Sequence, residues 1–152
     1  MKFVTGNLID LAEAGEFDLI VQGCNCFNTL GGGLAREVRE RYPDAAKVDA
    51  ATTKGDYDKL GNYTIMHSPK FDIVNAYTQY HMSRGDDVFE YAAFALILQK
   101  LAHRYPGRRF GFPLIGCGLA GGDESVIMEM LQRFADDVKL NNGTVTIVKF
   151  NP

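Results

Sequence analysis

The sequence lacks an excess of charge of either sign. Lys and Arg total 16 and Asp and Glu total 19, so the net charge is −3. A chain with this balance has no general attraction for nucleic acid or for an anionic membrane surface. The composition therefore predicts neither kind of partner, and any anionic ligand must be held by local groups.

Long apolar runs are also missing. No stretch approaches the roughly 18 apolar residues that a membrane helix needs, and the first residues do not form a charged segment followed by an apolar one. We therefore expect a cytoplasmic protein. Hydrophobic residues still make up 46% of the 152 residues, which is enough for one core, so residues 1–152 are expected to form a single domain.

Cysteine and histidine are scarce and scattered. The three cysteines and three histidines contain no C-x-x-C pair and no repeated ligand spacing. Cys24 and Cys26 stand too close along an extended segment for a disulfide of ordinary geometry. The sequence therefore predicts reduced thiols, no metal site and no cofactor.

Glycine, by contrast, is abundant. The chain has 16 glycines, where an average usage of about 7% predicts about 11. Four of them fall within residues 23–33 and five within residues 111–122. The excess is thus concentrated in two short segments.

Alternating apolar patterns predict an α/β protein. β-rich apolar runs predict strands at residues 2–5, 18–23, 63–67, 72–76, 109–115 and 144–150. Apolar residues at helical spacing predict helices at residues 8–14, 34–42, 88–102 and 127–138, with Pro43 ending the second helix and an ordered polar excursion at 44–61. This order predicts a three-layer α/β/α sandwich around a mixed, mostly parallel six-stranded sheet, with its ligand at the carboxyl ends of the strands.

Each glycine segment follows a predicted strand and precedes a predicted helix. In that position backbone amides and a helix N-terminus can hold phosphate, and two such loops favour one phosphate-bearing ligand clamped between them. Tight strand-to-helix turns alone explain either loop equally well. The second loop contains G-x-G-x-x-G but lacks the later acidic residue of a dinucleotide fold, and neither loop contains Gly-Lys-Ser/Thr. A Rossmann domain and a Walker loop are therefore disfavoured.

Five segments of the chain carry a more specific signal. They are residues 6–8, 20–25, 31–33, 75–79 and 113–123. Together they resemble the macrodomain family of ADP-ribose-binding α/β/α modules, and the resemblance covers nearly the whole chain. The strings Gly-Cys-Asn-Cys-Phe-Asn and Leu-Ala-Gly-Gly-Asp look most like a phage and bacterial branch labelled ADP-ribose 1″-phosphate phosphatases, which lies close to the terminal ADP-ribose glycohydrolases.

The resemblance implies roles for individual residues. Asn7, where many macrodomains have Asp, would accept from the adenine amino group through its carbonyl, while Leu8 offers its amide. Asn25 would bind the distal ribose, and Phe150 forms either a wall for the adenine or part of the core. The residues expected to line the ligand are Asn7, Leu8, Gly23, Asn25, Gly31, Gly32, Gly33, Leu34, Ile115, Gly116, Cys117, Gly118, Leu119, Ala120, Gly121 and Phe150.

Three residues are candidates for chemistry. Asn25 would position the ribose, and Asp123 would activate a water at the end of the second loop. Asp123 is equally well explained as the N-cap of the next helix. His81 would transfer a proton near neutral pH, or it is a solvated loop residue. The glycohydrolases carry an Asp and a Lys where this chain has Ala120 and Gln79, so their mechanism is not expected here.

These residues lead to one hypothesis and two alternatives. The protein is expected to bind ADP-ribose or ADP-ribose 1″-phosphate and to act as a hydrolase, either as a phosphatase on the 1″-phosphate or on a related ADP-ribosyl ester. The first alternative is a reader that binds ADP-ribose or an ADP-ribosylated protein without turnover. The second is a hydrolase that reverses ADP-ribosylation of proteins.

Overall fold

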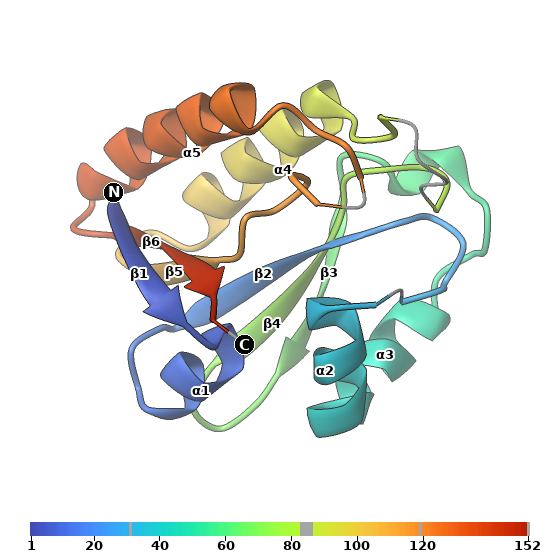
Figure 1. Cartoon of the computed structure of the whole chain (residues 1–152), viewed down its shortest axis with the longest axis horizontal. Helices are drawn as coiled ribbons and strands as arrows, with labels where there is room; N and C mark the ends of the chain where they lie inside the picture. Colours follow the sequence, from blue (N-terminus) through green and yellow to red (C-terminus); the bar gives the residue numbers. More distant parts are fainter. Residues whose placement is uncertain (31, 83–86, 119, 152) are drawn as a thin grey trace.

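The computed structural model describes residues 1–30, 32–82, 87–118 and 120–151, which form a six-stranded sheet between two helical layers (Figure 1). The strands are β1 (Lys2–Gly6), β2 (Leu19–Cys24), β3 (Tyr63–His67), β4 (Asp72–Tyr77), β5 (Arg109–Phe112) and β6 (Thr144–Phe150). Their order across the sheet is β1-β6-β5-β2-β4-β3. Every neighbouring pair is parallel except β3 and β4, so the carboxyl ends of all strands except β3 meet at one edge of the sheet.

Helices cover both faces of the sheet. α4 (Tyr91–Arg104) and α5 (Glu124–Lys139) lie on one face, while α1 (Leu8–Glu13), α2 (Leu34–Arg41) and α3 (Pro43–Ala50) lie on the other (Figure 1). A short 3₁₀ helix, η1 (Tyr57–Lys59), precedes β3. Successive residues of β2 enter different cores, since Val21 packs with residues of α4 and α5 whereas Ile20 packs with residues of α1 and α2. Within the described ranges, none of the helices combines the length and the apolar character needed to cross a bilayer.

The predicted fold class and the order of the predicted elements along the chain are confirmed, and several element bounds differ. β5 ends at Phe112 rather than at residue 115, because Pro113 has no amide with which to continue the ladder. The stretch after residue 42 begins with α3, where Pro43 occupies the first turn and its missing amide costs nothing. α4 begins at Tyr91 rather than at residue 88, because Phe89 instead forms an isolated bridge with Gln79.

Candidate ligand-binding crevice

Among the described residues, three adjoining cavities run along the carboxyl ends of the strands. The first, which we call the Phe150 cavity, encloses about 270 Å³. The central cavity, of about 350 Å³, shares Gly33 and Pro113 with it. The third, the Asn25 cavity, encloses about 200 Å³ and shares Gly32 with the central cavity. Neighbouring cavities share wall residues, so the three lie end to end along this edge of the sheet, and we call them together the crevice.

The first glycine segment leaves the N-terminus of α2 open toward the central cavity. Gly33 is the N-cap of α2 and has no side chain with which to make a capping hydrogen bond. Leu34 and Ala35, the first residues of the helix, line the cavity. The first amides of a helix have no partner within the helix and carry the positive end of its dipole, so this wall can bind an anion such as a diphosphate.

The second glycine segment forms the opposite wall in a different way. Gly116 and Gly118 line the central cavity, but the helix that follows them, α5, is already capped. The Asp123 carboxylate accepts from the Ser125 amide at 3.0 Å and from the Ser125 hydroxyl at 2.7 Å. The positive end of α5 is thus satisfied by the chain's own carboxylate. The two glycine loops, which look equivalent in the sequence, therefore differ in what they offer a ligand.

Close packing determines the shape of the second loop. Gly116 has a φ of +74°, and a Cβ at this position would lie 2.5 Å from the Phe89 ring. The Gly122 amide donates to the Gly116 carbonyl at 2.7 Å and closes the turn. A Cβ at Gly118 would meet nothing within 4 Å, so this position is open to the crevice.

Two buried polar side chains line the central cavity. Gln22 is 2% exposed and Thr78 is 1% exposed. Gln22 Nε2 donates to Asn75 Oδ1 at 2.7 Å, but Gln22 Oε1 and Thr78 Oγ1 have no partner among the described residues. A buried polar atom without a partner is destabilising, so these atoms are ones that a bound ligand or its water can satisfy.

The Asn25 side chain is engaged in its own loop. Its Oδ1 accepts from the Phe27 amide at 2.8 Å, and its Nδ2 donates to the Thr29 carbonyl at 2.8 Å. Asn25 is only 7% exposed, yet it lines the third cavity. The Asn25 side chain therefore holds the loop in shape and also forms part of the cavity wall.

A buried lysine supports the same loop from behind. Lys59 is 7% exposed, and its Nζ donates to the Cys26 carbonyl at 3.0 Å and to Asn28 Oδ1 at 2.6 Å. The Gly55 amide donates to the same Cys26 carbonyl at 2.7 Å. The polar stretch predicted as an excursion is thus the outer support of this end of the crevice.

Neither Asp123 nor His81 lines any of the three cavities. Asp123 is the exposed N-cap of α5, and hydrogen bonds from Ser125 lower its pKa. His81 stacks on Phe27 with 5.3 Å between the ring centroids, and its neighbour Met82 lines the Asn25 cavity. The described residues that line the central and Asn25 cavities include no Asp, Glu, His or Lys. The catalytic roles of Asp123 and His81 stay predictions.

The thiols close to the crevice are protonated at neutral pH. Burial raises the pKa of Cys24, and it raises the pKa of Cys117 to about 11. A protonated thiol is a poor nucleophile and a poor metal ligand. In the described part of the chain, no group of three His, Cys, Asp or Glu side chains is placed to hold a metal ion.

The Phe150 cavity is mostly apolar. Leu8 and Val148 are buried in its wall, whereas Phe150 is 63% exposed and borders the opening rather than the core. Asn7 Oδ1 accepts from the Asp10 amide at 2.9 Å as the N-cap of α1. The carbonyl that the resemblance assigns to adenine is thus already engaged at the start of a helix.

Most of the residues predicted to line the ligand come together in the crevice. They are Asn7, Leu8, Gly23, Asn25, Gly32, Gly33, Leu34, Ile115, Gly116, Gly118, Ala120 and Phe150. Cys117 and Gly121 belong to the second loop without lining a cavity. Gly31 and Leu119 lie outside the described residues.

Glu37 and Thr78 line the crevice but were missed by reasoning from the sequence. The sequence nevertheless carries a signal that could have placed both residues in the crevice. Glu37 lies one helical turn after Gly33, so the helical period places it on the same face as the start of α2. Thr78 directly follows the carboxyl end of β4, where ligands of parallel sheets bind.

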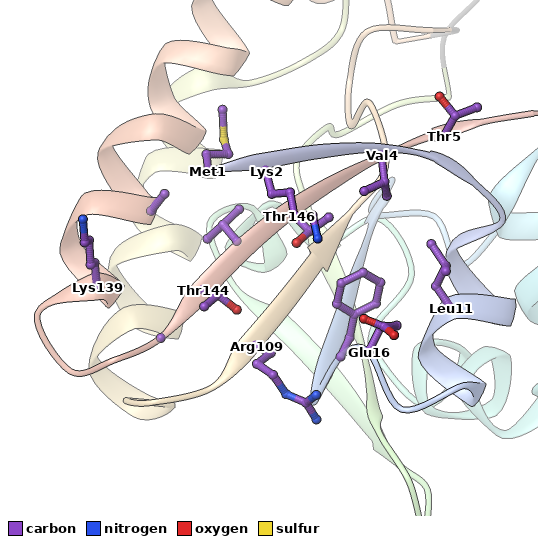
Figure 2. A pocket seen from close by; sticks show the side chains of 14 residues that line it. Met1, Lys2, Val4, Thr5, Leu11, Glu16, Arg109, Lys139, Thr144 and Thr146 are labelled. Carbon is purple, nitrogen blue, oxygen red and sulfur yellow. The ribbon is translucent and has the colours of Figure 1, made fainter.

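A larger hollow, of about 590 Å³, lies at the amino ends of β1, β5 and β6 (Figure 2). Its basic side chains, Lys2, Arg109 and Lys139, are spread around the hollow in Figure 2 and do not converge on one point. Arg109 is already paired with Asp18 Oδ1 at 2.9 Å and with the Gly15 carbonyl at 2.7 Å. None of the described residues that line this hollow has an unpartnered buried polar side-chain atom. The hollow is large, but the arrangement of its polar side chains does not indicate a ligand-binding site.

The fold and the crevice together define an α/β/α domain with a row of cavities across the carboxyl ends of its strands. An uncharacterized 17.5 kDa protein in the tk-vs intergenic region of Enterobacteria phage T4 is 27% identical over 149 residues, which cover 92% of this chain and 93% of the relative. No protein-family model matches the sequence.

Solved structures are more informative about the fold. The macrodomain of Mycobacterium tuberculosis DarG matches with a TM-score of 0.76 at 19% identity, over 99% of this chain and 97% of that chain. Thermosipho africanus DarTG in complex with ADP-ribose matches with a TM-score of 0.77 at 15% identity, over 98% of this chain and 42% of that chain. This chain therefore has the macrodomain fold, as its resemblance predicted.

Proposed function

We propose that this protein binds ADP-ribose extended along the crevice. The adenine occupies the Phe150 cavity, the diphosphate the central cavity and the distal ribose the Asn25 cavity. An open apolar pocket suits an aromatic base, and an uncapped helix N-terminus suits a diphosphate. The observation that carries the proposal is the end-to-end arrangement of the three cavities around the uncapped start of α2. The ADP-ribose complex of the structurally similar Thermosipho africanus DarTG supports the choice of ligand.

Calorimetric titration tests this proposal directly. We expect ADP-ribose to bind at a single site with micromolar affinity, and AMP and ribose 5-phosphate to bind more weakly because each fills only part of the crevice. Absence of ADP-ribose binding, or AMP binding as tightly as ADP-ribose, would contradict the extended arrangement.

Hydrolysis is the second part of the proposal. The resemblance to the phage and bacterial branch supports removal of the 1″-phosphate from ADP-ribose 1″-phosphate, or cleavage of a related ADP-ribosyl ester. His81 supports this because it lies in the segment of Gln79 and Met82, which line the Asn25 cavity. A different observation favours a reader without turnover. The described residues that line the central and Asn25 cavities include no Asp, Glu, His or Lys, and burial raises the pKa of the Cys24 thiol in the Asn25 cavity.

Phosphate release from ADP-ribose 1″-phosphate distinguishes the two. The assay compares the unaltered protein with His81→Asn and Asp123→Ser, because serine retains an N-cap but cannot act as a carboxylate base. Loss of phosphate release in either variant, with ADP-ribose affinity unchanged, supports a hydrolase. No release by the unaltered protein at high concentration supports the reader, and an ADP-ribosylated protein is then the next ligand to titrate.

A further inference from the structure

The Phe150 cavity contains a carboxylate whose role is not yet explained. Glu37 comes from α2 and lines the cavity together with the apolar side chains of Leu8, Leu34 and Val148. Its side chain is 27% exposed. A carboxylate against an apolar wall needs hydrogen-bond donors, so the partners of its two oxygens indicate what it is placed to do.

Two donors hold Glu37 in place through one oxygen. Asn7 Nδ2 donates to Glu37 Oε1 at 2.8 Å, and an Arg41 guanidinium nitrogen donates to the same oxygen at 2.9 Å. Both donors are themselves anchored, Asn7 by the Asp10 amide and Arg41 by ion pairs with Asp10 and Glu13. Since both bonds from the described residues end on Oε1, the carboxylate is oriented while Oε2 keeps its capacity to accept.

We infer that Glu37 Oε2 accepts a hydrogen bond from the exocyclic amino group of the bound base and makes the protein selective for adenine over a 6-oxopurine. This inference rests on the proposed function. Adenine carries an amino donor at its 6-position, whereas hypoxanthine carries a carbonyl oxygen there, which cannot donate to a carboxylate. Phe150, exposed at the opening of the cavity, offers its ring to the face of the base.

Calorimetric titrations of ADP-ribose and inosine diphosphate ribose into the full chain test the inference. The unaltered protein is expected to bind ADP-ribose at least about ten-fold more tightly than inosine diphosphate ribose. In Glu37→Gln the affinity for ADP-ribose is expected to fall about ten-fold, while the affinity for the inosine compound stays constant or rises because the glutamine amide can donate to the carbonyl oxygen at the 6-position of hypoxanthine. Glu40→Gln is the matched control, since Glu40 lies on the same helix, exposed and paired with Arg36, and neither affinity should change.

Each other outcome overturns the inference. Equal affinities of the unaltered protein for the two compounds exclude selectivity at the 6-position, and an equal loss of both affinities in Glu37→Gln assigns Glu37 a purely structural role. If Glu37→Gln does not fold, Glu37→Asp replaces it, with weaker ADP-ribose binding expected and unchanged binding contradicting the inference. No ADP-ribose binding at all overturns the proposed function as well, whereas binding without base selectivity overturns this inference alone.

Discussion

The two ends of the same parallel strands are both hollowed, but they are built differently. The hollow at the amino ends encloses about 590 Å³, against about 350 Å³ for the central cavity at the carboxyl ends. At the amino ends the hollow is lined by Arg109, whose guanidinium is already paired with Asp18. At the carboxyl ends a ligand would meet the uncapped start of α2 and the buried side-chain oxygens of Gln22 and Thr78, which have no partner in the part of the chain that the structure describes. Volume alone would favour the amino ends, whereas the buried polar atoms without a partner among the described residues lie at the carboxyl ends.

The largest expected effect comes from filling the central cavity. Gly118→Leu should lower ADP-ribose affinity about 100-fold, because position 118 opens onto the crevice and a side chain there occupies the place of the diphosphate. Thr144→Leu is the control at the amino ends, where it narrows the other hollow and should leave the affinity unchanged. Calorimetry measures both affinities, and circular dichroism checks the fold. If Thr144→Leu weakened binding as much as Gly118→Leu, the comparison between the two ends would be wrong.

The next effect concerns stability. Gly116→Ala should lower the free energy of unfolding by about 3 kcal/mol, because a positive φ and a Phe89 ring 2.5 Å from the new Cβ act together. Gly15→Ala, before β2 at the other end, has a φ of +90° but open space around it, and should cost only about 1–2 kcal/mol. Urea denaturation measures the two losses. Equal losses would show that the second loop adapts to a side chain.

A smaller effect depends on pH. Hydrogen bonds from Arg109 lower the pKa of Asp18. Because the folded-state pKa lies below the unfolded value of about 3.9, the stabilisation is present above about pH 4 and is lost as the pH falls through the folded-state pKa. At pH 7, Asp18→Asn should cost less than about 1 kcal/mol, since Arg109 is 47% exposed. The gap between the unfolding free energies of the two proteins should close in acid, and a gap that widened there would contradict this account.

The smallest expected effect is at the start of α5. Asp123→Ala should lower the melting temperature slightly, because the amides capped by this carboxylate lose their acceptor, whereas Asp123→Ser should largely restore it. ADP-ribose affinity should be unchanged in both variants, because Asp123 lines none of the three cavities. Thermal melts with and without ADP-ribose measure both quantities. A fall in affinity shared by the two variants would place the carboxylate at the ligand.

Much of the fold could be predicted because it depends on local patterns. The apolar runs of residues 144–150 and 63–67 became β6 and β3 with the predicted bounds. α3 was missed because its apolar residues are mostly small alanines, among them Ala45, which form no wide stripe. The end of β5 was predicted too late because the apolar run continues through Pro113, although the hydrogen-bonded ladder cannot.

The candidate site was predictable where it consists of backbone next to strand ends. The positions of Gly33, Gly116 and Gly118 in the crevice could be predicted because each follows a strand whose carboxyl end lies at the same edge of the sheet. The roles of Asn7 and Glu37 could not be predicted in this way. Their side chains are thirty positions apart in the sequence, and they meet because the start of α1 and the middle of α2 come together on one face of the sheet.

The sequence by itself determined the order of strands and helices and the two glycine loops, because these depend on periodicity and on the freedom of a residue without a side chain. Only the tertiary structure decided which groups remain without partners inside the crevice. Gln22 Oε1 has no partner within the described ranges, whereas the Asp123 carboxylate accepts from the Ser125 amide at the start of α5. The physical reason is that hydrogen-bond satisfaction depends on which distant segments meet, and that is settled by packing rather than by neighbours along the chain.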